Sequence, residues 1–248
     1  MPALFRKAKQ SRIFQDVVSQ IQGAILDGRI KAGDKLPSER ELGEMMGTSR
    51  GTLREALRVL EQKGLIEIRL GVGGGAVVKD PGGKQITESL AMLIRSQKIS
   101  LRHLAEFRED VEGTVTGMAA ERATDDDIRH LQDLLKAAKA CWEASTEEWR
   151  EFMRVDEQVH MFMARISGNP IYEFILKTIH DNIQIYYDRY LPRGPKELNE
   201  NYDDLCQLVA AVADRKAEQA VRVAREHVRR FNSYMQKKKR NTINREYP

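Results

Sequence analysis

The first apolar periodicity in the chain covers residues 13–26. Its apolar side chains recur every three or four positions, which is the spacing of one face of an α-helix. They are Ile13, Phe14, Val17, Val18, Ile21, Ile25 and Leu26. Gly28 follows at once and is typical of a helix C-terminus. The pattern therefore predicts an amphipathic helix that ends near Gly28.

Two shorter apolar stripes follow, and each begins with a capping residue. Ser38 and Glu41 have the spacing of a capping box, which opens a short helix. Ser49 is the next N-cap candidate, and the helix after it ends at Gly64. The apolar faces of the two helices consist of Leu42, Met45, Met46, Leu53, Ala56, Leu57 and Leu60. The sequence thus predicts a short helix, a turn and a longer helix.

The pattern then becomes extended. Residues 65–70 and 76–78 predict two strands, and the glycine-rich segment 71–75 between them predicts the loop of a hairpin. Residues 80–83, Asp-Pro-Gly-Gly, have the composition of a linker. The order of these elements is that of a winged helix-turn-helix, with three helices and a hairpin wing, and we assign it to residues 1–80.

Residues 84–240 contain helical periodicity and no convincing strand pattern. Ser100 and Thr124 are N-cap candidates, and Pro170 and Pro195 follow further breaks. The expected helices are 84–97, 100–123, 125–144, 147–167, 170–191, 196–212 and 215–239. About seven helices joined by short loops predict an all-α bundle, so the fold class of the whole chain is mainly α.

Composition and charge narrow the class of protein. The 248 residues contain no apolar run near the ~18 needed for a membrane helix, and the N-terminus lacks the apolar stretch of a signal peptide. With two cysteines and no CxxC, we expect a cytoplasmic protein with no membrane partner. Residues 1–80 hold 14 basic and 10 acidic side chains, whereas the remainder holds 27 of each. The net charge of +4 therefore lies in the first domain, which favours a polyanionic partner there.

The longer helix of the first domain has the side chains that major-groove recognition uses. Arg50, Arg54 and Arg58 recur every four residues and form one basic stripe, and arginine reads guanine by a bidentate contact. The same stripe could be a solvated helix face paired with Glu55 and Glu61. The surrounding capping box, turn and hairpin favour DNA binding. A phosphate cradle at residues 71–75 is a weaker alternative, because this glycine loop does not open a helix.

The helical domain contains one candidate metal site. Asp156 and His160 stand four residues apart on one helix face, where a carboxylate and an imidazole can share a divalent cation. His227 on the last helix is the natural third ligand. An ordinary Asp–His hydrogen bond is the alternative that the spacing leaves open.

Several motifs in this sequence together resemble a known family. Residues 36–42 (Leu-Pro-Ser-Glu-Arg-Glu-Leu), 49–57 (Ser-Arg-Gly-Thr-Leu-Arg-Glu-Ala-Leu) and 64–66 (Gly-Leu-Ile) resemble the DNA-binding domain of the GntR family of bacterial transcription regulators. The helical part is similar to the FCD ligand-binding domain of the FadR-type branch. Its motifs are at residues 107–112, 118–122, 156–160 and 167–169. The resemblance covers about residues 10–235.

The resemblance implies roles for six residues in DNA binding. Bases would be read by Arg40 and Arg50, with Arg54 on a base edge or a phosphate; phosphates would be bound by Ser49 and Thr52; and Gly71 would enter the minor groove. The family position before this glycine often carries a polar residue, and here it is Leu70. FadR-type proteins bind pseudo-palindromic operators as dimers, so the resemblance implies a homodimer on double-stranded operator DNA.

The resemblance also implies an effector site. Arg108 matches an arginine that faces the carboxylate of the effector, although a surface ion pair with Glu112 or Glu109 is the alternative. Members of the branch that bind fatty acyl-CoA lack a metal site, and residues 167–172 are similar to that subgroup. A small carboxylate and an acyl-CoA therefore both remain candidate effectors.

For the metal, the resemblance matches three of four positions. Many FCD domains bind a divalent ion such as Zn, Ni or Mn through an aspartate and three histidines, and Asp156, His160 and His227 match three of these. The remaining position falls at Leu205, which cannot bind a metal. Asp203 or Asp204 could take its place if the helix shifts, and His180 is a further candidate.

We therefore expect an effector-responsive transcription regulator, a repressor of a metabolic operon, and not an enzyme. The main alternative is a helical metalloenzyme that uses the Asp/His cluster, but the spacing places no further base or nucleophile beside that cluster. A structural nucleoid protein is a third candidate, but it leaves the large neutral bundle unexplained.

Overall fold

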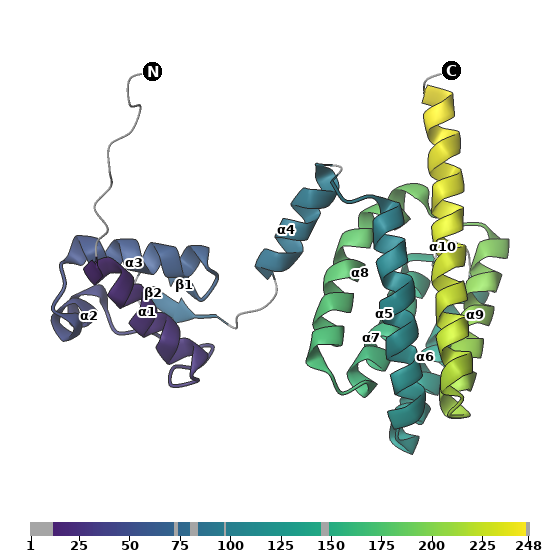
Figure 1. Ribbon diagram of the computed structural model, residues 1–248, viewed down its shortest axis with the longest axis horizontal. Helices are drawn as coiled ribbons and strands as arrows, with labels where there is room; N and C mark the ends of the chain where they lie inside the picture. Colours follow the sequence, from purple (N-terminus) through teal and green to yellow (C-terminus); the bar gives the residue numbers. More distant parts are fainter. Residues whose placement is uncertain (1–11, 72–73, 80–83, 97, 145–148, 247–248) are drawn as a thin grey trace. The chain divides into compact units, whose positions relative to one another are not determined.

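The computed structural model describes residues 12–71, 74–79, 84–96, 98–144 and 149–246. The chain divides into two compact units, residues 1–85 and 86–248, which are described one at a time. In its described part the chain forms ten helices and one two-stranded hairpin (Figure 1). The predicted fold class, a winged helix-turn-helix followed by an all-α bundle, is confirmed.

The first unit contains three helices and the hairpin. Strands β1 and β2 are antiparallel, with Ile66 opposite Val78 and Arg69 opposite Gly75. The apolar faces of all five elements meet in one small core, which contains Val17, Ile21, Leu42, Leu53 and Leu60. The elements are α1 (Arg12–Leu26), α2 (Glu39–Met46), α3 (Arg50–Gln62), β1 (Ile66–Arg69) and β2 (Gly75–Val78).

Local signals in the sequence set both ends of α2. Ser38 and Glu41 form the predicted capping box, because each side chain accepts a hydrogen bond from the other's backbone N–H. Gly47 ends α2 with a φ of 59°, a left-handed conformation that favours glycine. These two signals set the start and the end of α2, and the cap at Ser49 starts α3 at residue 50.

The second unit is a helical bundle in which α5 and α10 lie side by side along their length (Figure 1). Its core joins apolar residues of α5, α6, α7, α8, α9 and α10, including Val115, Leu131, Phe152, Leu205 and Ala224. The helices are α4 (Lys84–Arg95), α5 (Leu101–Arg122), α6 (Asp125–Ala144), α7 (Trp149–Ile166), α8 (Pro170–Tyr190), α9 (Pro195–Ala213) and α10 (Ala217–Glu246).

The last helix is longer than predicted. The sequence pattern ends it at residue 239, but α10 continues to Glu246. The apolar periodicity stops earlier, yet no glycine or proline occurs between residues 236 and 246, so nothing breaks the helix. Within the described ranges, no helix is both long enough and apolar enough to cross a membrane.

Candidate functional site

The N-terminus of α3 presents a polar, compact surface. Ser49 caps the helix by accepting a hydrogen bond from the backbone N–H of Thr52 at 3.2 Å, and the two hydroxyl oxygens lie 2.9 Å apart. The first free N–H groups of a helix carry partial positive charge and suit an anion such as a phosphate. Both residues therefore lie where phosphate contacts can form.

The arginines of this surface are all exposed. Arg50 and Arg58 make no ion pair within the part of the chain that the structure describes, and Arg54 lies 3.3 Å from Glu39. Arg40 is exposed on α2. Because their opposite face packs in the core through Leu53 and its neighbours, the α3 arginines cannot turn inward. The structure thus brings the predicted DNA-binding residues of α2 and α3 onto the outer surface of the first unit.

The wing is described at its base. Gly71 is exposed with a φ of 94°, a backbone conformation that favours glycine. Leu70 beside it is 94% exposed and carries no hydrogen-bonding side chain. Residues 72 and 73, which belong to the predicted hairpin loop, lie outside the described residues.

The second unit brings Asp156, His160 and His227 together inside the bundle. All three are buried, and one ligand atom from each lies within 4.8 Å of the others. Nε2 of His160 lies 3.2 Å from Nε2 of His227. Oδ1 of Asp156 lies 3.9 Å from the first nitrogen and 3.8 Å from the second. The structure thus brings together, from α7 and α10, the three residues that the sequence named as candidate ligands.

This triangle has the size that a metal ion requires. The point equidistant from the three atoms is about 2.1 Å from each, which matches the ~2.0–2.2 Å of metal bonds to imidazole and carboxylate. Oδ1 of Asp156 is buried without a hydrogen-bond partner. A buried, unpaired carboxylate costs several kcal/mol unless a cation compensates it. The residues present therefore fit a divalent ion held by two nitrogens and one oxygen.

Glu112 on α5 connects three neighbours of this centre. Its Oε1 lies 2.6 Å from Nε of Arg108 and 3.3 Å from Nε2 of His180, and its Oε2 lies 3.1 Å from Nδ1 of His160. Burial opposes ionisation, but Arg108 and the two histidines together hold the pKa of Glu112 well below its ordinary value. Burial lowers the pKa of His160 to about 4, against the influence of Glu112 and Asp156. At neutral pH the carboxylate is thus charged and the imidazole of His160 is neutral.

Arg108 forms the ion pair with Glu112 that the sequence analysis gave as the alternative to effector binding. The pair is buried and does not lie at the surface. The side chains of Arg108 and Glu112 are 2% and 1% exposed. A second donor of Arg108, Nη1, lies 2.5 Å from the hydroxyl oxygen of Tyr187. Burial disfavours the charge on Arg108, but Glu112 beside it raises the pKa of this arginine above its ordinary value. A carboxylate in this region would meet a cation that its neighbours already orient.

Leu205 stands at the sequence position of the fourth family ligand, and its surroundings in the structure are also apolar. Leu205 is fully buried in the core of the bundle, and Asp203 is exposed. Asp204 does reach the centre, but its Oδ2 contacts Nδ1 of His227 at 3.3 Å and not the side of the ring that faces Asp156. His180 contacts Glu112 and is not among the three converging residues. None of these three substitutes is therefore a direct ligand in this arrangement.

The sequence analysis named Glu112 only as a surface partner of Arg108, and Asp204 and His180 only as candidate ligands. It did not predict the contacts that these residues make with His160, His227 and Glu112. The available signal was the placement of charged residues on the buried face of an apolar helix. Glu112 follows Leu101, Leu104 and Ala105 on the inward face of α5. A charged residue at such a position is almost never buried unless it is paired with an opposite charge.

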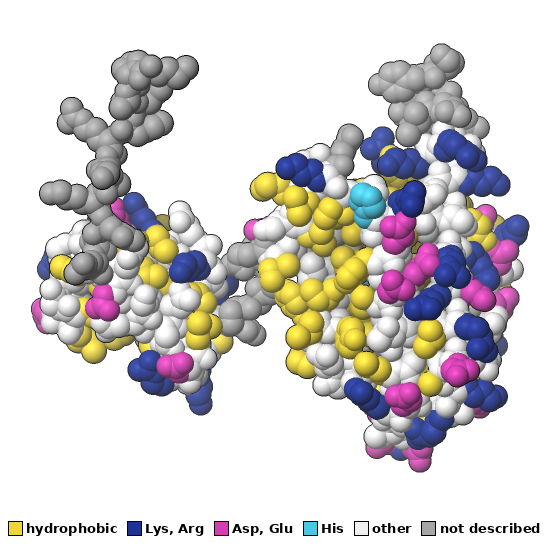
Figure 2. Space-filling view, in the orientation of Figure 1, with side chains coloured by type: hydrophobic (Ala, Val, Ile, Leu, Met, Phe, Trp, Pro, Cys, Tyr) yellow, Lys and Arg dark blue, Asp and Glu magenta, His cyan; other side chains and the backbone are white. Residues whose placement is uncertain are grey.

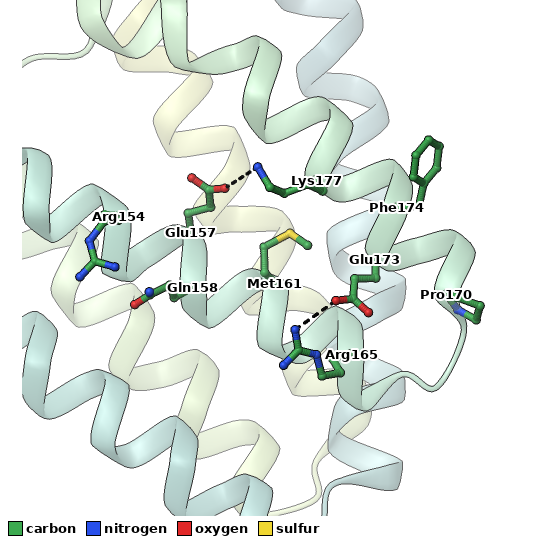
Figure 3. A pocket seen from close by; sticks show the side chains of 9 residues that line it. All are labelled: Arg154, Glu157, Gln158, Met161, Arg165, Pro170, Glu173, Phe174 and Lys177. Carbon is green, nitrogen blue, oxygen red and sulfur yellow. Dashed lines mark hydrogen bonds and ion pairs between the residues drawn. The ribbon is translucent and has the colours of Figure 1, made fainter. Parts of the chain in front are cut away.

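A separate groove lies on the outer surface between α7 and α8, with a volume of about 650 Å³. Figure 3 shows two ion pairs of this groove, Lys177 with Glu157 and Arg165 with Glu173. These charges satisfy one another, and no residue of the buried centre lines the groove. The groove is therefore not part of the Asp/His centre.

Comparison with known proteins assigns both units. Residues 14–75 match the family described as bacterial regulatory proteins, gntR family, and residues 103–230 match the FCD domain. The chain is 30% identical over 235 residues to the Glc operon transcriptional activator of Escherichia coli strain K12, which covers 90% of this chain and 89% of the relative. The chain belongs to the GntR family.

Other matches agree with this assignment. The GntR protein is 28% identical over 232 residues to the transcriptional repressor NanR of Klebsiella aerogenes, covering 90% of this chain and 85% of the relative. A solved structure, Streptococcus agalactiae GntR, has the same fold with a TM-score of 0.63 at 21% identity, covering 89% of this chain and 99% of that one.

The GntR protein is a DNA-binding transcription regulator with an FCD effector domain, and its relatives are regulators and not enzymes. The metalloenzyme alternative is therefore not supported, although FCD domains often bind metals.

Proposed function

We propose that this GntR protein is a cytoplasmic, homodimeric repressor of a metabolic operon that leaves its operator when a small carboxylate binds in the helical unit. The observation that carries the proposal is the buried cluster of the FCD domain, where Arg108, Glu112 and the Asp/His centre lie within a few ångströms of one another. A ligand that binds there favours one conformation of the dimer and shifts the population away from the DNA-bound form.

For DNA binding, we assign base contacts to Arg40 and Arg50 and phosphate contacts to Ser49 and Thr52. We assign Arg54 to a base edge or a phosphate; to make this contact it would give up its exposed ion pair with Glu39. Such a pair contributes little in water and is readily replaced. We assign Gly71 to the minor groove, where the exposed Leu70 supplies an apolar contact and no hydrogen bond.

For the effector domain, we propose that Asp156, His160 and His227 bind one divalent ion. A set of two imidazoles and one carboxylate suits Zn²⁺, Ni²⁺ or Mn²⁺. When bound, the ion supplies open coordination positions for a carboxylate or hydroxyl oxygen of the effector. The residues around the centre are charged and buried, which favours small hydroxycarboxylates and dicarboxylates over the long apolar chain of an acyl-CoA.

For the homodimer, an apolar face made by α4, α5 and α8 supports association of two copies (Figure 2). A groove of about 460 Å³ on this face is lined almost entirely by apolar side chains. The most exposed apolar residues on these three helices are Ile86, Met92, Leu93, Phe107, Ile171 and Ile185. Each of them is 41–71% exposed, and a contiguous exposed apolar patch is typical of a protein–protein interface.

The function is tested with operator fragments from the upstream region of the chain's own gene. Binding is followed by fluorescence anisotropy while hydroxycarboxylates, dicarboxylates and acyl-CoA are added one at a time. We expect a small carboxylate to release the DNA, and a reporter strain lacking the gene to show raised expression. Release by acyl-CoA alone, or lowered expression in that strain, would overturn the proposed effector class or the proposed sign of regulation.

The metal and the dimer have their own measurements. Elemental mass spectrometry of untagged protein should find about one divalent ion per chain, and none in His160→Ala. Sedimentation of the parent should give a dimer, and Phe107→Lys with Ile86→Ser should shift it toward monomer. The matched control is Ile13→Ser, an exposed apolar residue of the first unit. A monomeric parent contradicts the dimer directly.

A further inference from the structure

Positive side chains gather where α8 ends, α9 begins and α10 passes beside them. Nζ of Lys238 on α10 lies 3.1 Å from the backbone oxygen of Leu191, which joins α8 to α9. From there α10 continues past this end of the bundle (Figure 1). The basic cluster, as we call it, consists of Arg189, Arg193, Lys237, Lys238, Lys239 and Arg240.

Aromatic rings hold three members of the basic cluster in place. Cζ of Arg193 lies 4.0 Å from the ring centroid of Trp149. Cζ of Arg189 and Nζ of Lys239 lie 5.3 Å and 5.9 Å from the ring centroid of Tyr190. Such a contact orients a cation without neutralising it, because the ring carries no net charge. Within the described ranges, none of these three cations forms an ion pair with a carboxylate.

Lys237 and Arg240 point to solvent on α10. Successive residues of a helix are about 100° apart, so four consecutive cations surround most of its axis. Lys237 and Arg240 are exposed, and neither makes an ion pair within the part of the chain that the structure describes. The negative end of a helix dipole attracts cations only in the last turn, whereas α10 continues to Glu246. The dipole therefore does not account for cations at 237–240.

Exposed cations on α6 are placed differently, because each pairs with a carboxylate of its own helix. The pairs are Arg129 with Asp126, Lys136 with Asp133 and Lys139 with Glu143. In the basic cluster, Asp188 is exposed, but only its backbone oxygen accepts a hydrogen bond from Nη2 of Arg193, at 2.8 Å. The positive charge of the cluster thus remains available to a partner from outside the chain.

We propose that the basic cluster is a second DNA-binding surface, which contacts backbone phosphates on either side of the bases that α3 reads. The inference rests on DNA binding by the first unit and extends it to the helical unit. A row of phosphates suits several fixed cations, and their contact releases counterions from the DNA. Arginine in addition binds a phosphate through two parallel hydrogen bonds.

DNA fits this surface better than an anionic membrane does. A membrane-binding surface also needs exposed apolar side chains that enter the lipid, but Trp149 and Tyr190 are only 6% and 8% exposed. The first unit, moreover, holds DNA within reach of the same chain. A second contact to that DNA is therefore favoured by a high effective concentration.

The first experiment compares two duplexes with the full-length parent. One is the shortest duplex that retains operator binding, and the other extends it on each side by about two helical turns, ~20 base pairs. Fluorescence anisotropy over a series of salt concentrations should show tighter binding to the longer duplex. Its affinity should also fall more steeply with salt, by about 0.9 in the logarithmic slope for each added phosphate contact. Equal affinities and slopes on the two duplexes would overturn the inference.

The second experiment removes the exposed charges of α10 by combining Lys237→Gln, Lys239→Gln and Arg240→Gln. Three lost phosphate contacts should lower the slope on the longer duplex by about 2.7 per chain. The variant should then bind both duplexes as the parent binds the short one. The matched control combines Arg129→Gln, Lys136→Gln and Lys139→Gln on α6, with the same change in net charge. An equal loss in the control would attribute the effect to net charge and contradict a contact by the cluster.

The short duplex separates this inference from the function of the first unit. Normal binding of the short duplex by the α10 variant shows that base recognition by α3 is intact. A parent that binds neither duplex would refute DNA binding at both surfaces. A parent that binds both duplexes equally would refute the basic cluster alone.

Discussion

The two units of this GntR protein place their charged side chains in opposite environments. The arginines of α3 stand in water around a small apolar core, whereas Arg108, Glu112 and the Asp/His centre lie within the apolar core of the bundle. The first arrangement suits a large polyanion, which displaces water and counterions from exposed charges. The second suits a small ligand that can enter and complete a set of enclosed charges.

The environments also predict different consequences of mutation. An exposed charge contributes little to folding and can change the affinity for a partner without other effects. A buried charge contributes to folding and to ligand affinity, because removing this charge leaves its buried ion-pair partner uncompensated. The following experiments test this contrast in order of expected effect.

The largest effect is expected for Arg108→Ala. This change leaves Glu112 buried beside the centre without its main cation, and breaking such a pair costs about 3–5 kcal/mol of the free energy of unfolding. Urea unfolding of the full chain measures the loss. Arg102→Ala on the same helix removes an exposed ion pair with Glu106 and should leave the midpoint unchanged. Equal midpoints for the two variants would show that the buried pair is no more important than the surface pair.

Removal of the metal is expected to have the next effect. An ion that binds the folded form at a free concentration 100-fold above its Kd stabilises that form by about 2.7 kcal/mol. Addition of a chelator should therefore lower the melting temperature of the parent and leave His160→Ala unaffected. The comparison would break if both proteins responded equally, since the stabilising ion would then bind elsewhere.

Arg50→Ala should weaken specific operator binding by about 1–3 kcal/mol while leaving the melting temperature unchanged. Fluorescence anisotropy with a specific and a scrambled duplex separates base recognition from phosphate binding. Arg29→Ala, an exposed arginine outside α2 and α3, is the control. A loss of affinity that is equal on both duplexes would assign Arg50 to the backbone.

The smallest effect is expected for Ser49, which caps α3 and is also a proposed phosphate contact. Ser49→Ala removes the cap of α3 and should destabilise the first unit by about 1 kcal/mol. Ser49→Asp restores the cap but places a negative charge where a phosphate would bind. We expect the aspartate variant to melt like the parent and to bind DNA more weakly. Normal DNA binding by this variant would remove Ser49 from the phosphate contacts.

The sequence predicted best those features that depend on neighbouring residues. The capping box of Ser38 and Glu41, the cap at Ser49 and the cap at Ser100 all occur where the pattern placed them. Each depends on backbone groups within three residues, so a short stretch of sequence contains all the information. The pairing of Asp156 with His160 is local in the same sense, because four residues separate them.

The rest of the centre depends on packing between distant helices. Glu112 meets residues 160 and 180 only because α5 packs against α7 and α8, and Asp204 meets His227 only because α9 packs against α10. The side of a ring that a carboxylate approaches is set by this packing and not by spacing along the chain. This is why Asp204 was considered as a direct ligand, whereas the structure places it behind His227.

The separation between His160 and His227 along the chain gives the centre a further meaning. An ion held by both would close a loop of 67 residues, and closing a loop of this size restricts the unfolded chain by about 4 kcal/mol. The bundle would then contain a reversible cross-link, in a chain whose two cysteines form no disulfide. Unlike a disulfide, such a cross-link opens and closes with the supply of the ion, so the rigidity of the regulator would follow the metal content of its surroundings.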